Sequence, residues 1–247
     1  VKFKFINKIN QNLEKKVKSL NLKYLDKSDL ICSKINKTCS IFDKSQNEFF
    51  RNFWIHIYSR WKIAVTHGKS NYWQFPFYYA QITPLEYPEG QYSQIIRDAQ
   101  RKTLKKVEKT GMAILLDIGE KDNGHPGNKQ DVGKRLALLA LDKDYNYNIV
   151  SSGPLYENHR KVDDYIEISF KSVGSGLTSR GKLKNFEIAG RNKKFYKATA
   201  RVVGNKVRVY SKKIKRPKHI RYAWKNWVEA TLFNKEGLPA SSFQSEY

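Results

Sequence analysis

The sequence predicts an α/β region followed by a small antiparallel β-sandwich. Two successive strand–helix units indicate the α/β region: strands at residues 77–82 and 113–117, each followed by a helix, at 92–106 and 128–141. Such alternation is typical of parallel strands and of half of a doubly wound sheet. After about Tyr147 the pattern changes to short β-type runs at close spacing, which favours an antiparallel sandwich.

The first unit has the composition of buried α/β structure. Its strand, residues 77–82, is apolar on both faces, as a buried parallel strand should be. The helix that follows, residues 92–106, carries apolar residues at helical spacing. Its inward face is predicted to comprise Ile95, Ile96, Ala99 and Leu104.

The second unit carries the candidate site. An apolar run, residues 112–116, predicts a buried strand, and a helix then opens at residues 126–128. The apolar side of that helix is predicted to comprise Leu136, Leu138, Leu139 and Leu141. The polar loop between strand and helix contains Asp122 and His125. Open α/β sheets bind ligands at the carboxyl ends of their strands, so both residues are placed where a ligand would lie.

The Asp-x-x-His spacing of Asp122 and His125 is compatible with acid–base chemistry. The carboxylate can accept a hydrogen bond from one ring nitrogen and fix the tautomer, and the other nitrogen can then take a proton from a nucleophile. The same spacing also fits a helix-entry aspartate and a surface histidine. Spacing alone favours that second interpretation, because Asp-x-x-His is common by chance.

The C-terminal region is predicted to be built from short strands. The proposed strands are residues 148–151, 166–170, 186–189, 198–203 and 206–211. Gly204-Asn205 separates two alternating runs, which is typical of a β-hairpin. Residues 174–181 contain three glycines and are predicted to form a loop, and the closing GLPASSF segment is predicted to be irregular.

The segment GMAILLDIGEKDNGHPGNKQDVGKRLALLAL, residues 111–141, resembles the last motif block of the SGNH/GDSL hydrolases, and more narrowly of the sialate O-acetylesterases. That family has TGMAVTxDIG, an acid–x–x–HP–x–NK stretch and a helix beginning xxVGxRLA. Further blocks follow the order of the family from about Phe50 to the C-terminus. They are FPFYYAQITP, RDAQRKTL, SGPLY, ISFKSVGSGL, FEIAG, IRYAW and LFNKEGLPASSF.

The resemblance implies the C-terminal half of a flavodoxin-like SGNH-hydrolase sheet and a serine esterase of O-acetylated sialic acid or a related sugar, without metal or cofactor. It implies that His125 is the general base and Asp122 its orienting acid. The family's Gly-Gln-Ser-Asn nucleophile block and Gly-Glu-Ser-Asn oxyanion block are not found in their expected positions. The chain is therefore expected to be a C-terminal portion, with an upstream chain as a partner that supplies the serine.

Other polar residues fit the site less well. Ser70, in His67-Gly68-Lys69-Ser70-Asn71, imitates Gly-x-Ser-Asn but precedes the first strand, at the end of the sheet opposite His125. The remaining histidines without an acid in a matching motif are His56, His159 and His219. Gln81 and Glu86, near a strand's carboxyl end, fit either a pocket wall or a structural role.

Three regions follow from these patterns: a Lys/Asn-rich segment without a family match at 1–48, the α/β part at 49–146, and the sandwich at 147–247. A helix is expected near Phe50. Cys32 and Cys39 have six residues between them, a spacing that suits neither a zinc pair nor a thioredoxin-type motif. The visible sequence has no signal peptide and no apolar run of membrane-spanning length. The compartment stays open, although the family suggests secreted or periplasmic proteins.

The formal net charge of +24 raises a competing function, because such an excess attracts polyanions. The lysines are spread along the chain and no nucleic-acid motif is present, so no specific nucleic-acid partner is expected. Three alternatives to the sialate esterase are compatible with the same blocks: an inactive glycan-binding relative, an acetyl-xylan-type esterase, and a polyanion-binding protein.

Overall fold

A computed structural model describes residues 76–245 of the 247-residue chain. The expected helix near Phe50, the serine Ser70, His56 and the two cysteines lie outside the described residues. In chain order the elements are β1 (Phe77–Ala80), α4 (Ser93–Thr103), β2 (Thr110–Ala113), α5 (Lys129–Lys143), β3 (Leu155–Val162), β4 (Tyr165–Lys171), β5 (Leu177–Ser179), β6 (Phe186–Ala189), β7 (Phe195–Lys197), β8 (Thr199–Val203), β9 (Lys206–Tyr210), β10 (His219–Tyr222), β11 (Leu232–Asn234) and β12 (Phe243–Gln244). No helix of this described part is long and apolar enough to cross a membrane.

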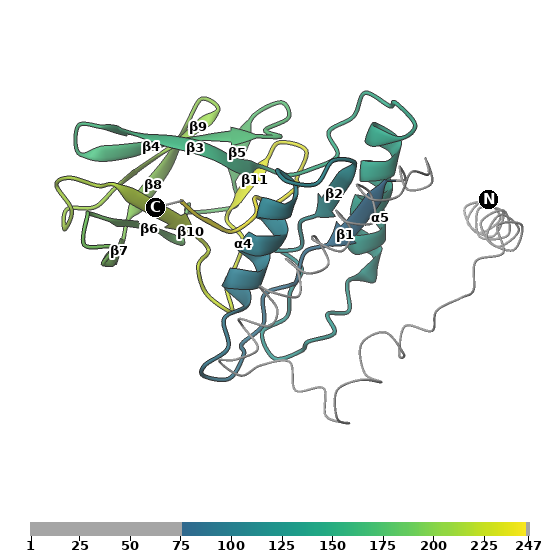
Figure 1. Ribbon diagram of the computed structural model, residues 1–247, viewed down its shortest axis with the longest axis horizontal. Coiled ribbons are helices and arrows are strands. Elements are labelled where there is room, and N and C mark those ends of the chain that lie inside the picture. The colour runs from purple at the N-terminus through teal and green to yellow at the C-terminus, as the bar shows by residue number, and fades with distance from the viewer. Residues whose placement is uncertain (1–75, 246–247) are drawn as a thin grey trace, which may run out of the picture. The chain divides into compact units, whose positions relative to one another are not determined.

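The strands β1 and β2 pair in parallel and are flanked by the two helices (Figure 1). Consecutive tyrosines of β1 point to opposite faces, because side chains alternate along a strand. Tyr79 donates a hydrogen bond to the carbonyl of Gln100 on α4 (2.7 Å), and Tyr78 donates to Asp144 at the end of α5 (2.8 Å). The predicted strand–helix–strand–helix order is therefore confirmed, with one helix on each face of the parallel pair.

The limits of the second unit differ from those predicted. The strand ends at Ala113 rather than at residue 117. The final backbone hydrogen bond between the two strands runs from the Gln81 N–H to the Ala113 carbonyl, and no later residue of the second strand pairs with the first. The residues beyond, 114–116, are buried without a strand partner among the described residues. The helix begins as predicted: Asn128 caps it by accepting a hydrogen bond from the N–H of Asp131 (3.1 Å).

The inward face of α4 is only partly the apolar one that was predicted. Ile96 is buried, but Ile95 is 37% exposed, so its predicted inward orientation is wrong. Most of the buried side chains of α4 are polar: Ser93, Gln94, Arg97, Asp98, Gln100 and Arg101. The reason is that α4 packs against the C-terminal segment and its carbonyl groups, which accept hydrogen bonds that an aliphatic face could not supply.

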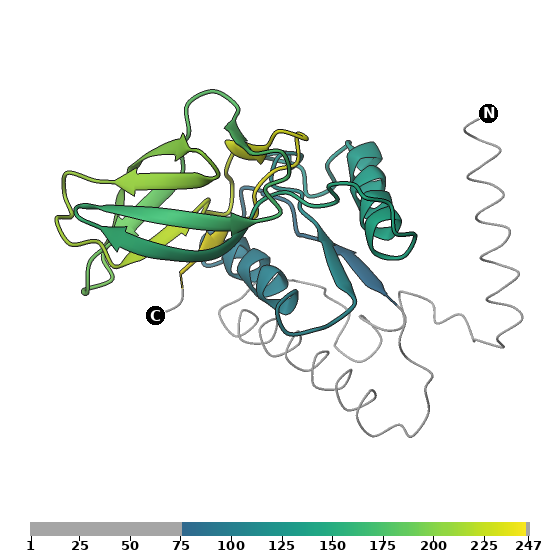
Figure 2. The same ribbon diagram turned by 90° about the horizontal axis from the view of Figure 1, so that it is seen from above.

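The C-terminal region contains two four-stranded antiparallel sheets, with strand orders β3-β4-β9-β8 and β12-β10-β6-β7, and a short β11-β5 pair. Figure 2 shows these strands from above, coloured green to yellow. One apolar core includes residues of both large sheets, among them Ile168, Val207, Ile188 and Ile220, all fully buried. The sandwich packing and the flavodoxin-like origin of the parallel pair stay predictions.

Most of the predicted short strands are confirmed, including the hairpin at Gly204-Asn205 between β8 and β9. Gly204 has φ +58°, a conformation that glycine adopts without strain. Residues 148–151 are not a strand; Ile149 N–H instead bonds locally to the Tyr147 carbonyl. The predicted loop at 174–181 contains β5, which pairs with β11. This pairing is long-range, so local composition did not indicate it.

Candidate active site

The loop between β2 and α5, residues 114–128, carries both predicted site residues. It leaves the carboxyl end of β2, and the side chains of Asp122 and His125 are exposed on it. The structure thus places the imidazole on the side of the parallel pair where the sequence placed it. Its role as general base stays a prediction.

The backbone around His125 is held by a second acid, which sequence reasoning did not single out. Asn123 accepts a hydrogen bond from the His125 N–H (2.9 Å) and donates to the His125 carbonyl (3.1 Å) and to Glu120 (2.9 Å). Glu120 also accepts from the Gly127 N–H (2.6 Å). The Gly127 backbone bond, together with the Asn123 amide, holds the pKa of Glu120 below its ordinary value. Glu120 and Asn123 therefore set the shape of the loop.

In the described part of the chain, no hydrogen bond or ion pair joins the Asp122 carboxylate to the His125 ring. Both side chains are exposed, so a change of rotamer is sterically open to each. The backbone of His125 is fixed by Asn123, whereas the imidazole makes no hydrogen bond to any other described residue.

The start of the loop is anchored to α5 by a buried ion pair. Arg135 donates two parallel hydrogen bonds to the Asp117 carboxylate, at 2.6 and 2.7 Å, and a third to the Ile114 carbonyl at 2.6 Å. Both charged side chains are only 8% exposed. A bidentate arginine–carboxylate pair fixes orientation as well as distance, so the strand end and the helix cannot move independently.

The loop after β1 lies against the loop that carries the candidate site. Gly119 packs directly on Pro84, and the N–H of Glu86 donates to the Lys121 carbonyl (2.8 Å). Glu86 is exposed beside this contact and forms a 3.6 Å ion pair with Lys121. Gln81, by contrast, is buried and donates to Ser241 of the C-terminal tail (2.8 Å), so the structural interpretation holds for it.

A buried arginine of α4 ties the C-terminal part of the chain to these loops. Arg97 is fully buried and donates to Ser242 (3.1 Å), to Ser93 (3.0 Å) and to the carbonyls of Lys225 and Asn226. Burial lowers the pKa of Arg97 to about 9. The C-terminal tail therefore packs as an ordered part of the core, although it contains little regular secondary structure.

The segment 223–230 closes a small hollow beside the candidate loop. Asn226 anchors it, accepting from the Ser93 N–H (2.8 Å) and donating to the Gln91 carbonyl (2.6 Å). The hollow has a volume of about 130 Å³. It is lined by Leu116, Asp117, Gly119, Arg180, Trp227, Val228, Glu229, Ala230 and Phe233. Residues from the α/β loop and from the β-rich region thus share one concave surface.

The other described histidines have structural surroundings. The two ring nitrogens of His159 lie 2.7 Å from the Tyr156 hydroxyl and 3.0 Å from the Lys218 carbonyl. His219 is 4% exposed on β10, and burial lowers its pKa. Within residues 76–245, no group of three or more His, Cys, Asp or Glu side chains is arranged to hold a metal ion.

Comparison with known proteins relates the chain to a solved structure. The chain is similar to the crystal structure of a carbohydrate acetylesterase from Xanthomonas citri, with 31% sequence identity, a TM-score of 0.71 and coverage of 83% of this chain. The chain is related in fold to a carbohydrate esterase. It spans about half of that protein, 48% of its length. No protein-family profile and no curated protein matches the sequence.

Proposed function

We propose that this chain supplies the histidine–acid side of the active site of a serine esterase that removes acetyl groups from sugars. The observation that carries the proposal is the 31% identity to a carbohydrate acetylesterase, together with His125 on the loop at the carboxyl end of β2. Ligands of open α/β sheets bind at that edge.

In the proposed reaction His125 acts first as a base and then as an acid. A serine hydroxyl attacks the acetyl carbonyl, His125 takes its proton, and an oxyanion forms. Collapse of this intermediate breaks the bond to the sugar oxygen, which receives the proton from His125 and leaves. Water, deprotonated by His125, then attacks the acetyl carbonyl; the bond to the serine oxygen breaks, that oxygen takes the proton back from His125, and acetate leaves. Asp122 accepts a hydrogen bond from the imidazole, while Glu120 and Asn123 hold the loop.

The serine belongs to the proposal and is placed outside the described residues. None of the serines in the described part forms a hydrogen bond with the His125 ring. The absence of the two serine blocks from their expected positions in the sequence supports a nucleophile from an upstream chain or portion. Only residual rate enhancement is expected without it.

The proposed substrate is an O-acetylated sialic acid or a related sugar, because the motif around His125 resembles that of the sialate O-acetylesterases. An acetyl-xylan-type esterase uses the same scaffold and differs only in the sugar. A degenerate relative would keep sugar binding without turnover. The sialate esterase, the acetyl-xylan-type esterase and the inactive relative share this loop, so they are distinguished by testing a set of acetylated sugars as substrates.

The experiment compares hydrolysis of p-nitrophenyl acetate and of O-acetylated sialic acid by the purified chain, alone and with a polypeptide that carries the two serine blocks. We expect little turnover alone and restored turnover in the mixture, lost in His125→Ala but kept in the control His159→Ala. Robust turnover by the chain alone that is lost in both His125→Ala and Ser70→Ala would identify Ser70 as the nucleophile. Restored turnover that survives His125→Ala would refute the assignment.

A further inference from the structure

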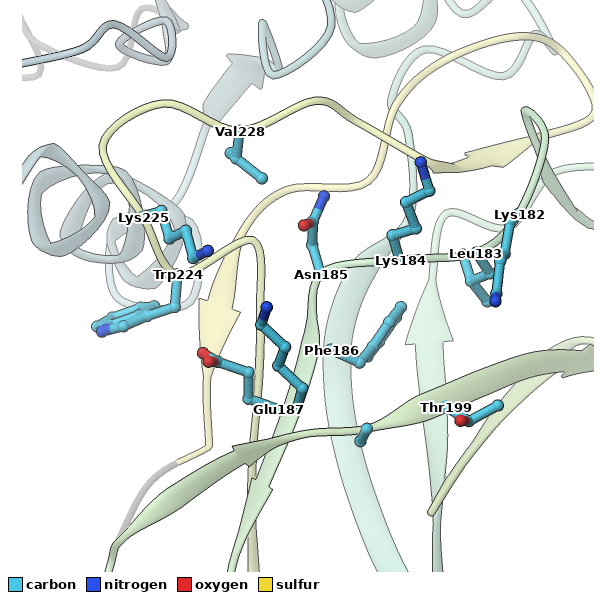
Figure 3. Close-up of a pocket in the computed structure, with 12 residues that line it drawn as sticks. Lys182, Leu183, Lys184, Asn185, Phe186, Glu187, Thr199, Trp224, Lys225 and Val228 are labelled. Carbon is cyan, nitrogen blue, oxygen red and sulfur yellow. The ribbon is translucent and has the colours of Figure 1, made fainter. Parts of the chain in front are cut away.

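A second cavity lies in the β-rich region, between the strand that begins at Phe186 and the segment 223–230 (Figure 3). Its volume is about 320 Å³, which is within the size range of ligand pockets. Its apolar surface includes Leu183, Phe186 and Val228, each less than a tenth exposed. The cavity thus has an apolar floor of the kind that supports the ring of a small organic ligand.

Lysines surround this floor. Lys182, Lys184, Lys197 and Lys225 line the cavity, and all four side chains belong to exposed residues. None of them forms an ion pair with another described residue. Figure 3 shows Lys184 and Lys225 on different segments of the chain, with their ammonium groups apart.

The cavity lining contains one acid, Glu187, which lies opposite Lys197 in the β6–β7 register but forms its ion pair with Arg221. Glu187 accepts a hydrogen bond from Arg221 at 2.7 Å, and this arginine balances its charge. The cavity is therefore left with four cations. Unpaired cations around a concave, partly apolar surface attract anions more strongly than the same charges on an open surface.

The frame of the cavity is held by hydrogen bonds between its two walls. Asn185 donates to the Glu229 carbonyl at 2.9 Å, and the N–H of Lys184 donates to Thr231 at 3.1 Å. Asn185 has φ +67°, which turns the chain toward the opposite wall. The two walls are therefore held together before a ligand binds, which lowers the entropic cost of binding.

The cavity borders the candidate active site through a shared wall. Val228 lines both this cavity and the 130 Å³ hollow beside Asp117 and Gly119. The segment 223–230 lies between the two spaces, and the hollow on its other side is lined by Asp117 and Gly119 of the loop that carries His125. The larger cavity therefore adjoins the hollow beside this loop.

We propose that the lysine-lined cavity binds an acidic sugar unit, with a carboxylate or sulfate against the lysines and the ring on the apolar floor. This deepens the proposed function and rests on it for the identity of the ligand as a glycan. A nucleic acid is the less suitable ligand, because its binding favours an extended basic stripe with stacking platforms rather than one concave site.

Binding is measured by calorimetry on the full chain at physiological salt. The ligands are an oligosaccharide of sialic acid, a sulfated oligosaccharide, a neutral xylo-oligosaccharide and a single-stranded oligonucleotide of similar length. We expect both acidic oligosaccharides to bind, and the neutral one to bind at least about ten-fold more weakly. The tighter of the two acidic oligosaccharides identifies the acidic group.

The double variant Lys184→Gln/Lys225→Gln should weaken binding of the acidic oligosaccharides by about ten-fold, because it removes two solvent-exposed charge pairs between the lysines and the ligand. The matched control Lys161→Gln/Lys212→Gln removes the same charge from exposed lysines outside the cavity and should change the affinity by less than about two-fold. Equal weakening in both doubles would overturn the proposal in favour of diffuse attraction. An oligonucleotide that binds as tightly as the acidic sugars, or no acidic binding at millimolar concentration, would overturn it too.

These measurements require no nucleophile, so they separate the two proposals. Retained binding with failed esterase reconstitution would refute the proposed function alone, whereas restored esterase activity with no acidic preference would refute only the subsite.

Discussion

Replacing Gly119 by alanine should displace the loop that carries His125. A Cβ atom at this position would lie 2.8 Å from Cδ of Pro84 and 3.0 Å from its nitrogen, and closer still to its carbonyl oxygen. These are backbone and ring atoms that cannot rotate away. The two loops at the carboxyl ends of β1 and β2 must therefore separate to admit one methyl group.

The expected cost follows from this overlap. Overpacking a tight contact costs about 1–3 kcal/mol, because side chains and backbone shift from their minima. For a chain of this size, each kcal/mol lowers the melting temperature by about 2–4 °C. Gly119→Ala should accordingly melt roughly 2–12 °C below the unaltered chain.

Thermal denaturation followed by circular dichroism measures the effect. Gly124→Ala in the same loop is the matched control, because its Cβ would meet only a Leu85 methyl carbon at 3.7 Å, an ordinary contact. In the reconstituted esterase assay, Gly119→Ala should also lose activity, whereas Gly124→Ala should retain it. Equal melting temperatures for the two variants would refute the argument that the loops are packed through Gly119.

Three further substitutions test the surrounding structure. Salt-bridging cations lower the pKa of Glu167 to about 2 from 4.5, so its contribution to stability is present above pH 4.5 and is lost as the pH falls toward 2. The difference in free energy of unfolding between the unaltered chain and Glu167→Gln, measured by urea titration, should become smaller as the pH falls from 4.5 toward 2. A difference that does not change with pH would contradict this. Tyr222→Phe removes the hydroxyl that accepts from the N–H groups of Thr231 and Leu232, and should cost about 1–3 kcal/mol in the same titrations. Arg97→Met leaves buried carbonyls without a donor and should lower the free energy of unfolding by about 1–3 kcal/mol. An unchanged urea midpoint would contradict this.

The sequence predicted those elements whose pattern is local. The strand–helix order around β1 and β2, the helix start at residues 126–128 and the hairpin at Gly204 depend on neighbouring residues, and all three are present. The short strand β5 was missed because its partner β11 is more than fifty residues away along the chain. Local composition in a glycine-rich segment carries no signal of such a partner.

In the candidate site, too, the sequence indicated some residues and the structure added others. Asp122 and His125 were proposed from the motif, and both lie on the predicted loop, while their catalytic roles stay a prediction. Glu120 and Asn123, which hold that loop, were not singled out, although an acid and an amide so close to the histidine were visible as a signal. Their role depends on backbone donors that approach only when the loop is folded.

The sequence by itself determined the alternation of strands and helices, the loop with its histidine and the excess of positive charge. Only the tertiary structure decided that Arg97 is a buried donor rather than a surface charge, and that lysines from separate segments line one cavity. The physical reason is that periodicity reports which face of an element is apolar, whereas hydrogen-bond acceptors and neighbouring cations come from distant segments. Those contacts exist only after the chain has folded.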